Sequence, residues 1–215
     1  MTKLTKNWEK EPQESIIKRI SEKIPHKKEP LKERIDYVLW RLKVQHEKLE
    51  QTLTRMQNHD KELFEKCVKA ELSRDHARAA IYANECAEVR KMAKIIVLSQ
   101  LALEKVMLRL ETVKEFGETL KEIAPVSGVI HNIKGKLSGI IPEVSYELGA
   151  ISEMLNGMAV EVGEASGASI PFEAENEESK RILEEASAIV EQKMKERFPE
   201  TPSAYKESST SNLRI

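Results

Sequence analysis

Aromatic residues, glycine and proline are scarce in this 215-residue sequence. Aromatic residues make up 5% of it, and it holds 8 glycines and 8 prolines, most of them outside the middle of the chain. β-Sandwiches and barrels need many turns rich in glycine and proline, so this composition argues against them. The sequence predicts an all-α protein with long helices.

Cysteine is also rare. Cys67 and Cys86 are the two cysteines, and neither belongs to a CxxC pair or a Cys/His cluster. This count excludes a disulfide scaffold and gives no support for a structural zinc site. We expect two reduced, buried thiols.

Motifs for catalysis are missing as well. The segment "GKLSG" lacks the preceding glycine and the spacing of a nucleotide-binding loop, and the five histidines form no HxxH or HExxH pair. The chain offers no nucleophile beside a base. We therefore expect no enzyme activity, no catalytic residue, no metal site and no cofactor.

No uninterrupted apolar run is long enough to cross a bilayer. The strongest one, Ile95 to Leu110, contains Glu104, Lys105 and Arg109, whereas a spanning helix needs about 20 apolar residues. The first residues lack the apolar core of a secretory signal, which predicts a cytoplasmic protein.

Charge is abundant but unevenly distributed. Charged residues make up 33% of the chain and the formal net charge is −1. Residues 1–34 hold ten Lys or Arg and six Asp or Glu, whereas residues 143–200 hold five and fourteen. A basic front can face an anionic surface, and an acidic back can fold over it. Solvated helix faces without a partner would give the same pattern. Aromatic residues are not interleaved with the basic ones, so no nucleic-acid partner is expected.

Residues 1–30 form a basic leader with a short amphipathic segment. Ile16, Ile20 and Ile24 recur at intervals of four, and Pro25 ends the pattern. Such a segment can enter a membrane interface, with its basic residues toward anionic headgroups. Alternatively, it packs on the rest of the chain or on the next subunit. The candidate membrane-binding residues are Lys3, Leu4, Lys6, Trp8, Lys10, Ile16, Ile17, Lys18, Arg19 and Ile20.

Residues 31–124 carry two long apolar stripes with alternating steps of three and four. Because a helix from residue 31 to about 72 would be on the order of 60 Å long, it must lie against another rod. The stripes differ in phase, which predicts a break near "LSRDHA", with Ser73 or Asp75 as the cap. The economical arrangement is an antiparallel helical hairpin. His46 and Asp60 occupy two apolar seam positions of the first stripe.

Further apolar residues lie outside this seam and need other neighbours. Those neighbours would be later helices of the same chain, other copies of the chain, or first one and then the other in different states. An ordinary four- or five-helix core is an alternative. These candidate interface residues are Tyr37, Trp40, Val44, Ile95, Leu98, Leu101, Val106 and Leu108.

The chain beyond residue 124 divides into three segments. Three glycines between two prolines predict a flexible hinge over residues 125–142. Residues 143–197 form acidic helices with a loop between them, the last helix covering about 177–197. Residues 198–215 form a polar tail predicted to be disordered and to contain a proline-bearing segment.

The sequence resembles a known family. A long basic first helix followed by "AAIYANECAEVRKMAK", then a glycine-bearing connection and "IPEVSYELGAISEML" in an acidic half, is similar to the ESCRT-III family, in particular its archaeal CdvB-type cell-division members. The likeness covers roughly residues 31–200.

The resemblance implies a hairpin core with shorter carboxyl-terminal helices packing back on it. Subunits of this kind polymerise with themselves and with paralogues on the inner face of the cell membrane at the division site, and constrict or sever it. The eight candidate interface residues would then be a polymer interface. An AAA ATPase with a MIT domain would disassemble the filament, directly or through another paralogue.

The resemblance also implies that closure and ATPase binding involve the acidic helices. We expect closure to join the acidic helices to basic positions of the rods, among them Arg41, Lys48 and Arg74. The candidate autoinhibitory residues are Arg78, Arg90, Lys91, Glu178, Glu184, Glu185 and Glu191. The candidate ATPase-binding residues are Leu183, Val190, Met194, Phe198, Pro199 and Pro202. The competing hypothesis is a coiled-coil adaptor or holdase that grips soluble partners without polymerising.

Overall fold

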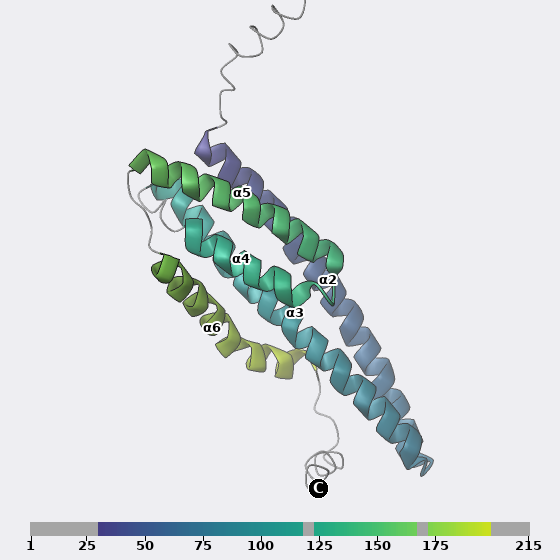
Figure 1. Cartoon of the computed structure of the whole chain (residues 1–215). Helices are drawn as coiled ribbons and strands as arrows, with labels where there is room; N and C mark the ends of the chain where they lie inside the picture. The colour runs from purple at the N-terminus through teal and green to yellow at the C-terminus, as the bar shows by residue number, and fades with distance from the viewer. Residues whose placement is uncertain (1–29, 118–122, 167–171, 199–215) are drawn as a thin grey trace, which may run out of the picture. The chain divides into compact units, whose positions relative to one another are not determined.

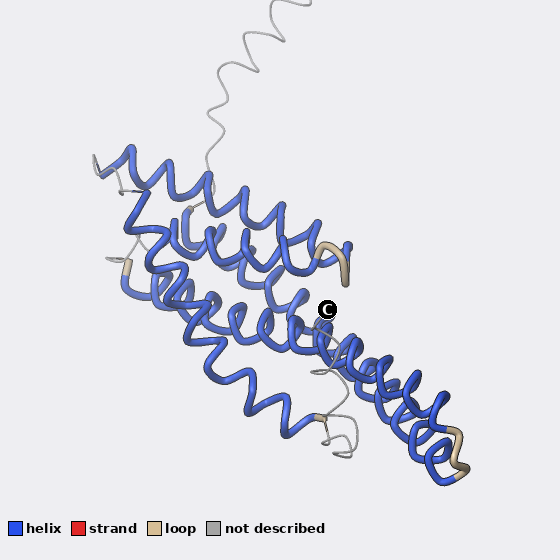
Figure 2. Tube along the Cα trace, turned by 60° about the horizontal axis from the view of Figure 1, so that its bottom comes forward, coloured by secondary structure: helices blue, strands red, loops and turns tan. Residues whose placement is uncertain are grey.

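The computed structural model describes residues 30–117, 123–166 and 172–198. The chain divides into residues 1–30 and 31–215, and the helices described lie in the second part. The described residues form five helices and no strand (Figures 1 and 2), so the all-α prediction is confirmed for them. The helices are α2 (Leu31–Leu72), α3 (His76–Phe116), α4 (Ile123–Leu137), α5 (Pro142–Ser166) and α6 (Phe172–Arg197).

A tight turn separates α2 from α3 where the two stripes change phase. The Asp75 carboxylate accepts a hydrogen bond from the backbone N–H of Arg78 at 3.2 Å, which caps the free amino end of α3. Arg74 adopts a left-handed backbone conformation with φ of 59°. At its other end, α3 stops at Gly117, whose φ of 62° and N–H bond to the Val113 carbonyl form a left-handed cap.

Residues near the start of α2 contact residues near the end of α3, and residues near the end of α2 contact residues near the start of α3. The Lys114 amine donates to Asp36 at 2.6 Å, His46 and Glu104 approach to 3.1 Å, and the Cys67 thiol donates to the Ala79 carbonyl at 3.4 Å. The two helices therefore run side by side in opposite directions, as Figure 2 shows. Leucine, isoleucine and small residues of the predicted stripes fill the seam, including Ile35, Leu42, Leu49, Leu53, Ala93, Ile96, Leu103 and Leu110.

Near the turn, the seam contains both cysteines. Cys67 and Cys86 are free and buried, as expected from the sequence. Burial, with the Asp60 carboxylate nearby, raises the pKa of the Cys86 thiol to about 11. The thiol is therefore neutral and unreactive near neutral pH.

The shorter helices cover the half of the seam that lies away from this turn (Figure 1). Helix α4 contacts α3, α5 and α6, while α5 contacts α2 and α6 contacts α3. One continuous core joins all five helices, with large buried side chains from the later helices that include Ile123, Ile130, Ile133, Leu137, Leu148, Ile151, Leu155, Ile182 and Val190. Part of the extra apolar surface on the first two helices thus has partners within the chain.

The segment predicted as a hinge is mostly helical, which corrects that expectation. Residues 123–137 form α4, and only residues 138–141 connect it to α5. Pro125 lies in the first turn, where its missing N–H costs little, and Gly135 has open space around it. Burial of the apolar face of α4 outweighs the low helix propensity of its glycines. The next loop is also shorter than expected, because α5 extends to Ser166 and α6 begins at Phe172.

Serine side chains connect α4 to its neighbours. The Ser127 and Ser152 hydroxyls lie 3.0 Å apart, and Ser127 also donates to the Ser152 carbonyl at 3.1 Å. Ser145 donates to the Lys134 carbonyl at 2.9 Å, and Ser179 donates to the Pro125 carbonyl at 2.7 Å. These four serines are buried. Their bonds satisfy polar groups that would otherwise be costly inside the core.

None of the helices in the described ranges is long and apolar enough to cross a membrane.

Candidate interaction surfaces

Acidic residues of α6 face basic residues of α3. Ion pairs join Lys94 to Glu191, Lys105 to Glu185, and Arg109 to Glu178. Beneath them, Ile182, Ala186 and Val190 of α6 are buried in the core. The outer row of charges therefore covers an inner row of apolar contacts; we call this contact the α3–α6 seam.

A second charged seam joins α2 to α5. Arg34 pairs with Glu161 at 2.7 Å, Arg41 with Glu147 at 2.6 Å, and Lys48 with Glu143. The participation of Arg41 and Lys48 agrees with the expectation that the acidic helices neutralise the first rod. Helix α5 contains five glutamates and no basic residue. Each of these partly exposed pairs contributes at most about 1 kcal/mol, so apolar burial supplies most of the closing free energy.

Three of these carboxylates have a pKa below the ordinary value of 4.5. Hydrogen bonds from Lys48, Lys105 and Lys94 lower the pKa of Glu143, Glu185 and Glu191, respectively. A carboxylate whose pKa is lowered by a contact stabilises that contact at pH values above the ordinary pKa of the carboxylate. The stabilisation is lost as the pH falls through the lowered pKa.

Lowering the pH from 7 to below about 4 should therefore loosen both seams. Energy transfer between dyes on Ala87→Cys in α3 and Ser187→Cys in α6 reports the α3–α6 seam, and both sites are exposed. The native thiols are buried and stay unlabelled. A variant with Lys94→Gln and Lys105→Gln should show a weaker pH dependence at the same sites. Equal pH dependence in the two proteins would contradict this prediction.

The last turn of α6 is attached to α2. The Arg197 guanidinium donates to Glu50 at 2.9 Å, and the Gln57 amide donates to the Arg197 carbonyl at 3.5 Å. Burial acts to raise the pKa of Glu50, but hydrogen bonds from Arg197 and Gln100 outweigh it and lower that pKa. Phe198 is buried with its ring 6.0 Å from the Arg90 guanidinium carbon.

The buried Asp60 of α2 forms an ion pair with the partly buried Arg90 of α3. The Arg90 Nε and Nη2 atoms donate to the two carboxylate oxygens of Asp60 at 2.7 and 2.9 Å. The Asp60 residue is 1% exposed. The pair explains why an aspartate occupies an apolar seam position: Arg90 neutralises it there.

In the predicted autoinhibitory set, three of the four acidic residues have the expected kind of partner but the basic residues do not. Glu178, Glu185 and Glu191 pair with α3 as expected. On the basic side the expectation is wrong, because Arg90 pairs with Asp60, and local ion pairs join Arg78 to Asp75 and Lys91 to Glu88. Glu184 is exposed. The sequence did not identify Lys94, Lys105 and Arg109, although these basic residues follow Lys91 along α3 at helical spacing.

The candidate polymer-interface residues divide into three groups. Tyr37, Trp40, Val44 and Leu108 are exposed, whereas Ile95 and Leu98 are half-buried and packed against the core. Leu101 and Val106 are buried in the core that all five helices share. Neighbours within the same chain are one of the alternatives that the sequence left open for them.

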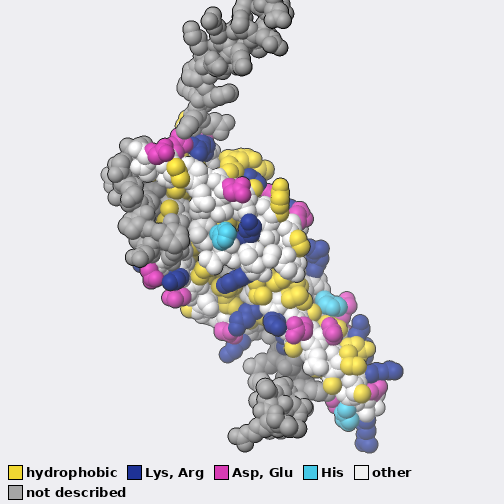
Figure 3. All heavy atoms as spheres, viewed as in Figure 1, with side chains coloured by type: hydrophobic (Ala, Val, Ile, Leu, Met, Phe, Trp, Pro, Cys, Tyr) yellow, Lys and Arg dark blue, Asp and Glu magenta, His cyan; other side chains and the backbone are white. Residues whose placement is uncertain are grey.

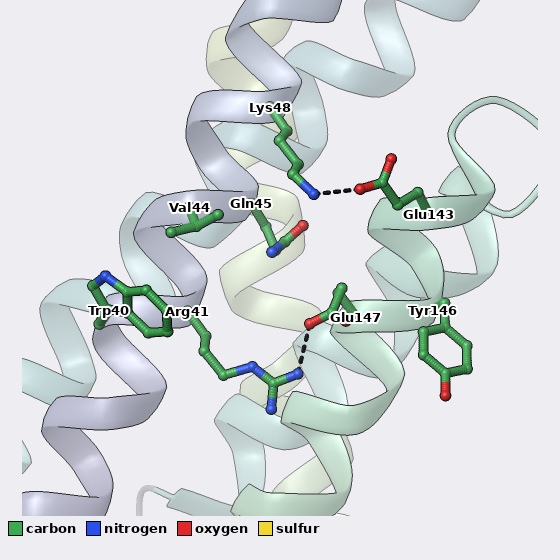
Figure 4. Close-up of a pocket in the computed structure, with 8 residues that line it drawn as sticks. All are labelled: Trp40, Arg41, Val44, Gln45, Lys48, Glu143, Tyr146 and Glu147. Atoms are coloured by element: carbon green, nitrogen blue, oxygen red, sulfur yellow. Dashed lines mark hydrogen bonds and ion pairs between the residues drawn. The ribbon is translucent and has the colours of Figure 1, made fainter.

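A groove of about 350 Å³ lies between α2 and α5 (Figure 4). Its lining residues are Trp40, Arg41, Val44, Gln45, Lys48, Glu143, Tyr146 and Glu147. The Gln45 amide lies between the Lys48–Glu143 and Arg41–Glu147 pairs. We call this feature the α2–α5 groove. Gln45 and Tyr146 were not predicted as site residues, because neither belongs to an apolar stripe.

The candidate ATPase-binding residues are mostly covered. Val190 and Phe198 are buried, and Leu183 and Met194 are half-buried against the core. A partner could reach this face of α6 only after α6 leaves α3. Pro199 and Pro202 lie outside the described residues, as do all ten candidate membrane-binding residues in positions 3–20.

Figure 3 shows basic and acidic side chains interspersed, with hydrophobic side chains between them. This mixture fits a state in which the acidic helices neutralise the basic ones.

Over 182 residues, which make up 85% of this chain and 85% of the relative, the sequence is 46% identical to cell division protein B1 of Sulfolobus acidocaldarius. The chain belongs to the CdvB-type cell division protein family. A second relative of this CdvB-type protein, cell division protein B of the same organism, is 37% identical over 172 residues, covering 80% of the chain and 66% of the relative. No protein-family model matches the CdvB-type chain, and no solved structure matches it.

Proposed function

We propose that this CdvB-type protein is a membrane-remodelling filament subunit of archaeal cell division. In this proposal, α2 and α3 form the hairpin core that polymerises, and α5 and α6 hold the monomer closed. The α3–α6 seam carries the proposal: its ion pairs and its apolar row hide the same face of α3. When α6 leaves α3, charged and apolar surface become exposed together. A subunit that assembles only when triggered requires such a change.

The membrane supplies the trigger in this proposal. The basic leader binds the anionic inner face of the cell membrane, and anionic headgroups compete with the acidic helices for the basic residues of α3. An AAA ATPase with a MIT domain then reaches α6 in the open state. Its direct contact residues would be Val190 and Phe198, which are buried in the closed state.

Sedimentation with and without anionic liposomes, across a range of salt concentrations, tests this function. We expect the full chain to stay discrete without lipid at low salt and to form filaments, seen by electron microscopy, on anionic liposomes. Uncharged liposomes are the control. A chain that binds soluble partners yet remains discrete on anionic liposomes would instead be an adaptor or holdase, and the proposal would fail.

A further inference from the structure

The charged seam between α2 and α5 uses the basic residues of α2 only as far as Lys48, which pairs with Glu143 in the first turn of α5. The next basic residue on this side of α2 is Arg55, seven residues further on. Helix α5 begins at Pro142, whereas α2 continues to Leu72. The second half of α2 therefore extends beyond α5, as Figure 1 shows, and its basic side lacks the acidic helix that covers the first half.

Six exposed residues follow one line along this second half of α2, at alternating steps of four and three. Such steps keep side chains on the same side of a helix. Arg55 donates to the nearby Thr52 hydroxyl at 3.0 Å, and none of the six forms an ion pair with a described residue. We call them the free row of α2: Arg55, His59, Glu62, Lys66, Lys69 and Ser73.

Helix α5 carries a second row, which is acidic. Three of its five glutamates pair with α2, whereas Glu153 and Glu164 are exposed and form no ion pair within the described ranges. Steps of four and three connect these two to small and apolar residues, of which Tyr146 is 77% exposed and Val160 is 61% exposed. We call this line the outer row of α5: Tyr146, Ala150, Glu153, Gly157, Val160 and Glu164.

The charges of the two rows are opposite in sign and equal in spacing. Arg55 and Lys66 are eleven residues apart, and Glu153 and Glu164 are also eleven residues apart. Eleven residues make about three helical turns, so both charges of each row project from one side of the helix. Two antiparallel helices then bring Arg55 opposite Glu164 and Lys66 opposite Glu153 at the same time.

The other residues of the rows favour this antiparallel register. Gly157 comes opposite Glu62, so the one acidic residue of the free row meets no carboxylate. Tyr146 reaches the end of α2, where Leu72 is 81% exposed. A parallel register would instead place Tyr146 opposite Lys48, where α5 of the same molecule already lies. The antiparallel register therefore satisfies both charge and space.

We propose that the outer row of α5 in one copy of this chain docks antiparallel on the free row of α2 in the next copy. Within one molecule the two rows cannot meet, because Glu143 and Glu147 fix α5 to the first half of α2. The inference rests on the proposed self-assembly and names one of its contacts. Two different surfaces meet, and each copy keeps one of each free, so the contact extends into an open filament unless its rotation closes a ring.

This contact is weak between free copies, because exposed ion pairs contribute little each. It leaves α5 and α6 in place, so the chain need not open to form it. Copies that bind one membrane have a higher local concentration, and the weak contact then becomes populated. The contact thus agrees with a chain that stays discrete in solution and assembles on anionic liposomes.

Disulfide cross-linking of the full chain tests the pairing. In the antiparallel register His59 faces Val160, and both residues are exposed. We expect His59→Cys protein mixed with Val160→Cys protein to form a disulfide dimer under mild oxidation at high protein concentration, with far less dimer in either protein alone. The native cysteines are buried. In the matched control, Thr54→Cys, an exposed site outside the free row of α2, replaces His59→Cys. Equal yields with His59→Cys and Thr54→Cys would overturn the docking model.

Charge reversal tests the same contact through assembly. Protein with Arg55→Glu and Lys66→Glu, or protein with Glu153→Lys and Glu164→Lys, should need about tenfold more protein than wild type to assemble on anionic liposomes. An equal mixture of the two variants should assemble like wild type, because every contact in an alternating filament again joins opposite charges. All four sites are exposed, so the melting temperatures should stay close to that of wild type. If the mixture assembles no better than either variant alone, the docking model is wrong.

The outcomes distinguish this contact from the proposed function. If both charge variants form filaments as readily as wild type, the contact is wrong and the filament function stands. If the α2 variant no longer binds anionic liposomes and the α5 variant does not restore binding, lipid rather than α5 occupies the free row, and the docking model fails. If the wild-type chain forms no filament on anionic liposomes but the mixed cysteine proteins cross-link selectively, the contact is right and the filament function fails.

Discussion

Deletion of residues 167–215 should lower the concentration at which the chain assembles by about a hundredfold at low salt. The deletion removes α6, and with it the three ion pairs of the α3–α6 seam, the Arg197–Glu50 pair with α2, and the cover over the apolar face of α3. The ion pairs are at least partly solvated and add little, whereas each buried aliphatic side chain of α6 adds about 1.5–3 kcal/mol. The free energy that holds the full chain closed would then exceed about 3 kcal/mol, which corresponds to more than a hundredfold. Sedimentation against protein concentration, with negative-stain electron microscopy, measures the change.

Charge reversal provides the matched control for this deletion, because an exposed apolar face can also aggregate. Lys94→Glu, Lys105→Glu and Arg109→Glu together should open the full-length chain in the same direction, by a smaller amount. Adding Glu178→Lys, Glu185→Lys and Glu191→Lys restores opposite charges across the α3–α6 seam and should return the chain to its closed state. If the shortened chain remains monomeric at low salt on anionic liposomes, α6 does not restrain assembly.

Asp60→Ala should destabilise the folded chain by about 3 kcal/mol, because it leaves the largely buried Arg90 guanidinium without its counter-charge. Urea unfolding at neutral pH, followed by circular dichroism, measures this loss. Glu88→Ala removes one partner of an exposed pair with Lys91 and should cost less than about 1 kcal/mol. Replacing both Asp60 and Arg90 by Leu should recover much of the loss, since no charge is then stranded. Equal costs for Asp60→Ala and Glu88→Ala would show that the pair is solvated.

The two long helices could be predicted because their periodicity extends over many turns. The change of phase between the stripes placed the break within residues 72–77, and of the two candidate caps, Ser73 and Asp75, it is Asp75 that caps α3. Helix α4 could not be located in this way. Gly128 and Gly135 lower its helix propensity, and its apolar positions are consistent with a helix only once α3, α5 and α6 surround them.

The charge pattern predicted that the acidic helices would face basic ones, but it gave the wrong basic residues on α3. Net charge describes a segment, whereas an ion pair requires two side chains at the same height on facing helices. Arg90 illustrates the difference: it is basic and on the right helix, yet Asp60 on α2 neutralises it inside the seam. Gln45 has a buried amide oxygen without a hydrogen-bond partner in the described residues. This too could not be predicted from the sequence, because the burial depends on α5 lying beside α2.

The buried serine bonds of α4 constrain how this molecule can rearrange. Sliding α4 along α5 by a single turn would separate Ser127 from Ser152 and Ser145 from the Lys134 carbonyl at once, leaving several polar atoms stranded in a dry interior. Tilting both helices as one block keeps these bonds intact. In any conformational change, α4 and α5 should therefore move together as one rigid unit. Of these serine bonds, only the one from the Ser179 hydroxyl joins α6 to α4, so α6 can detach first.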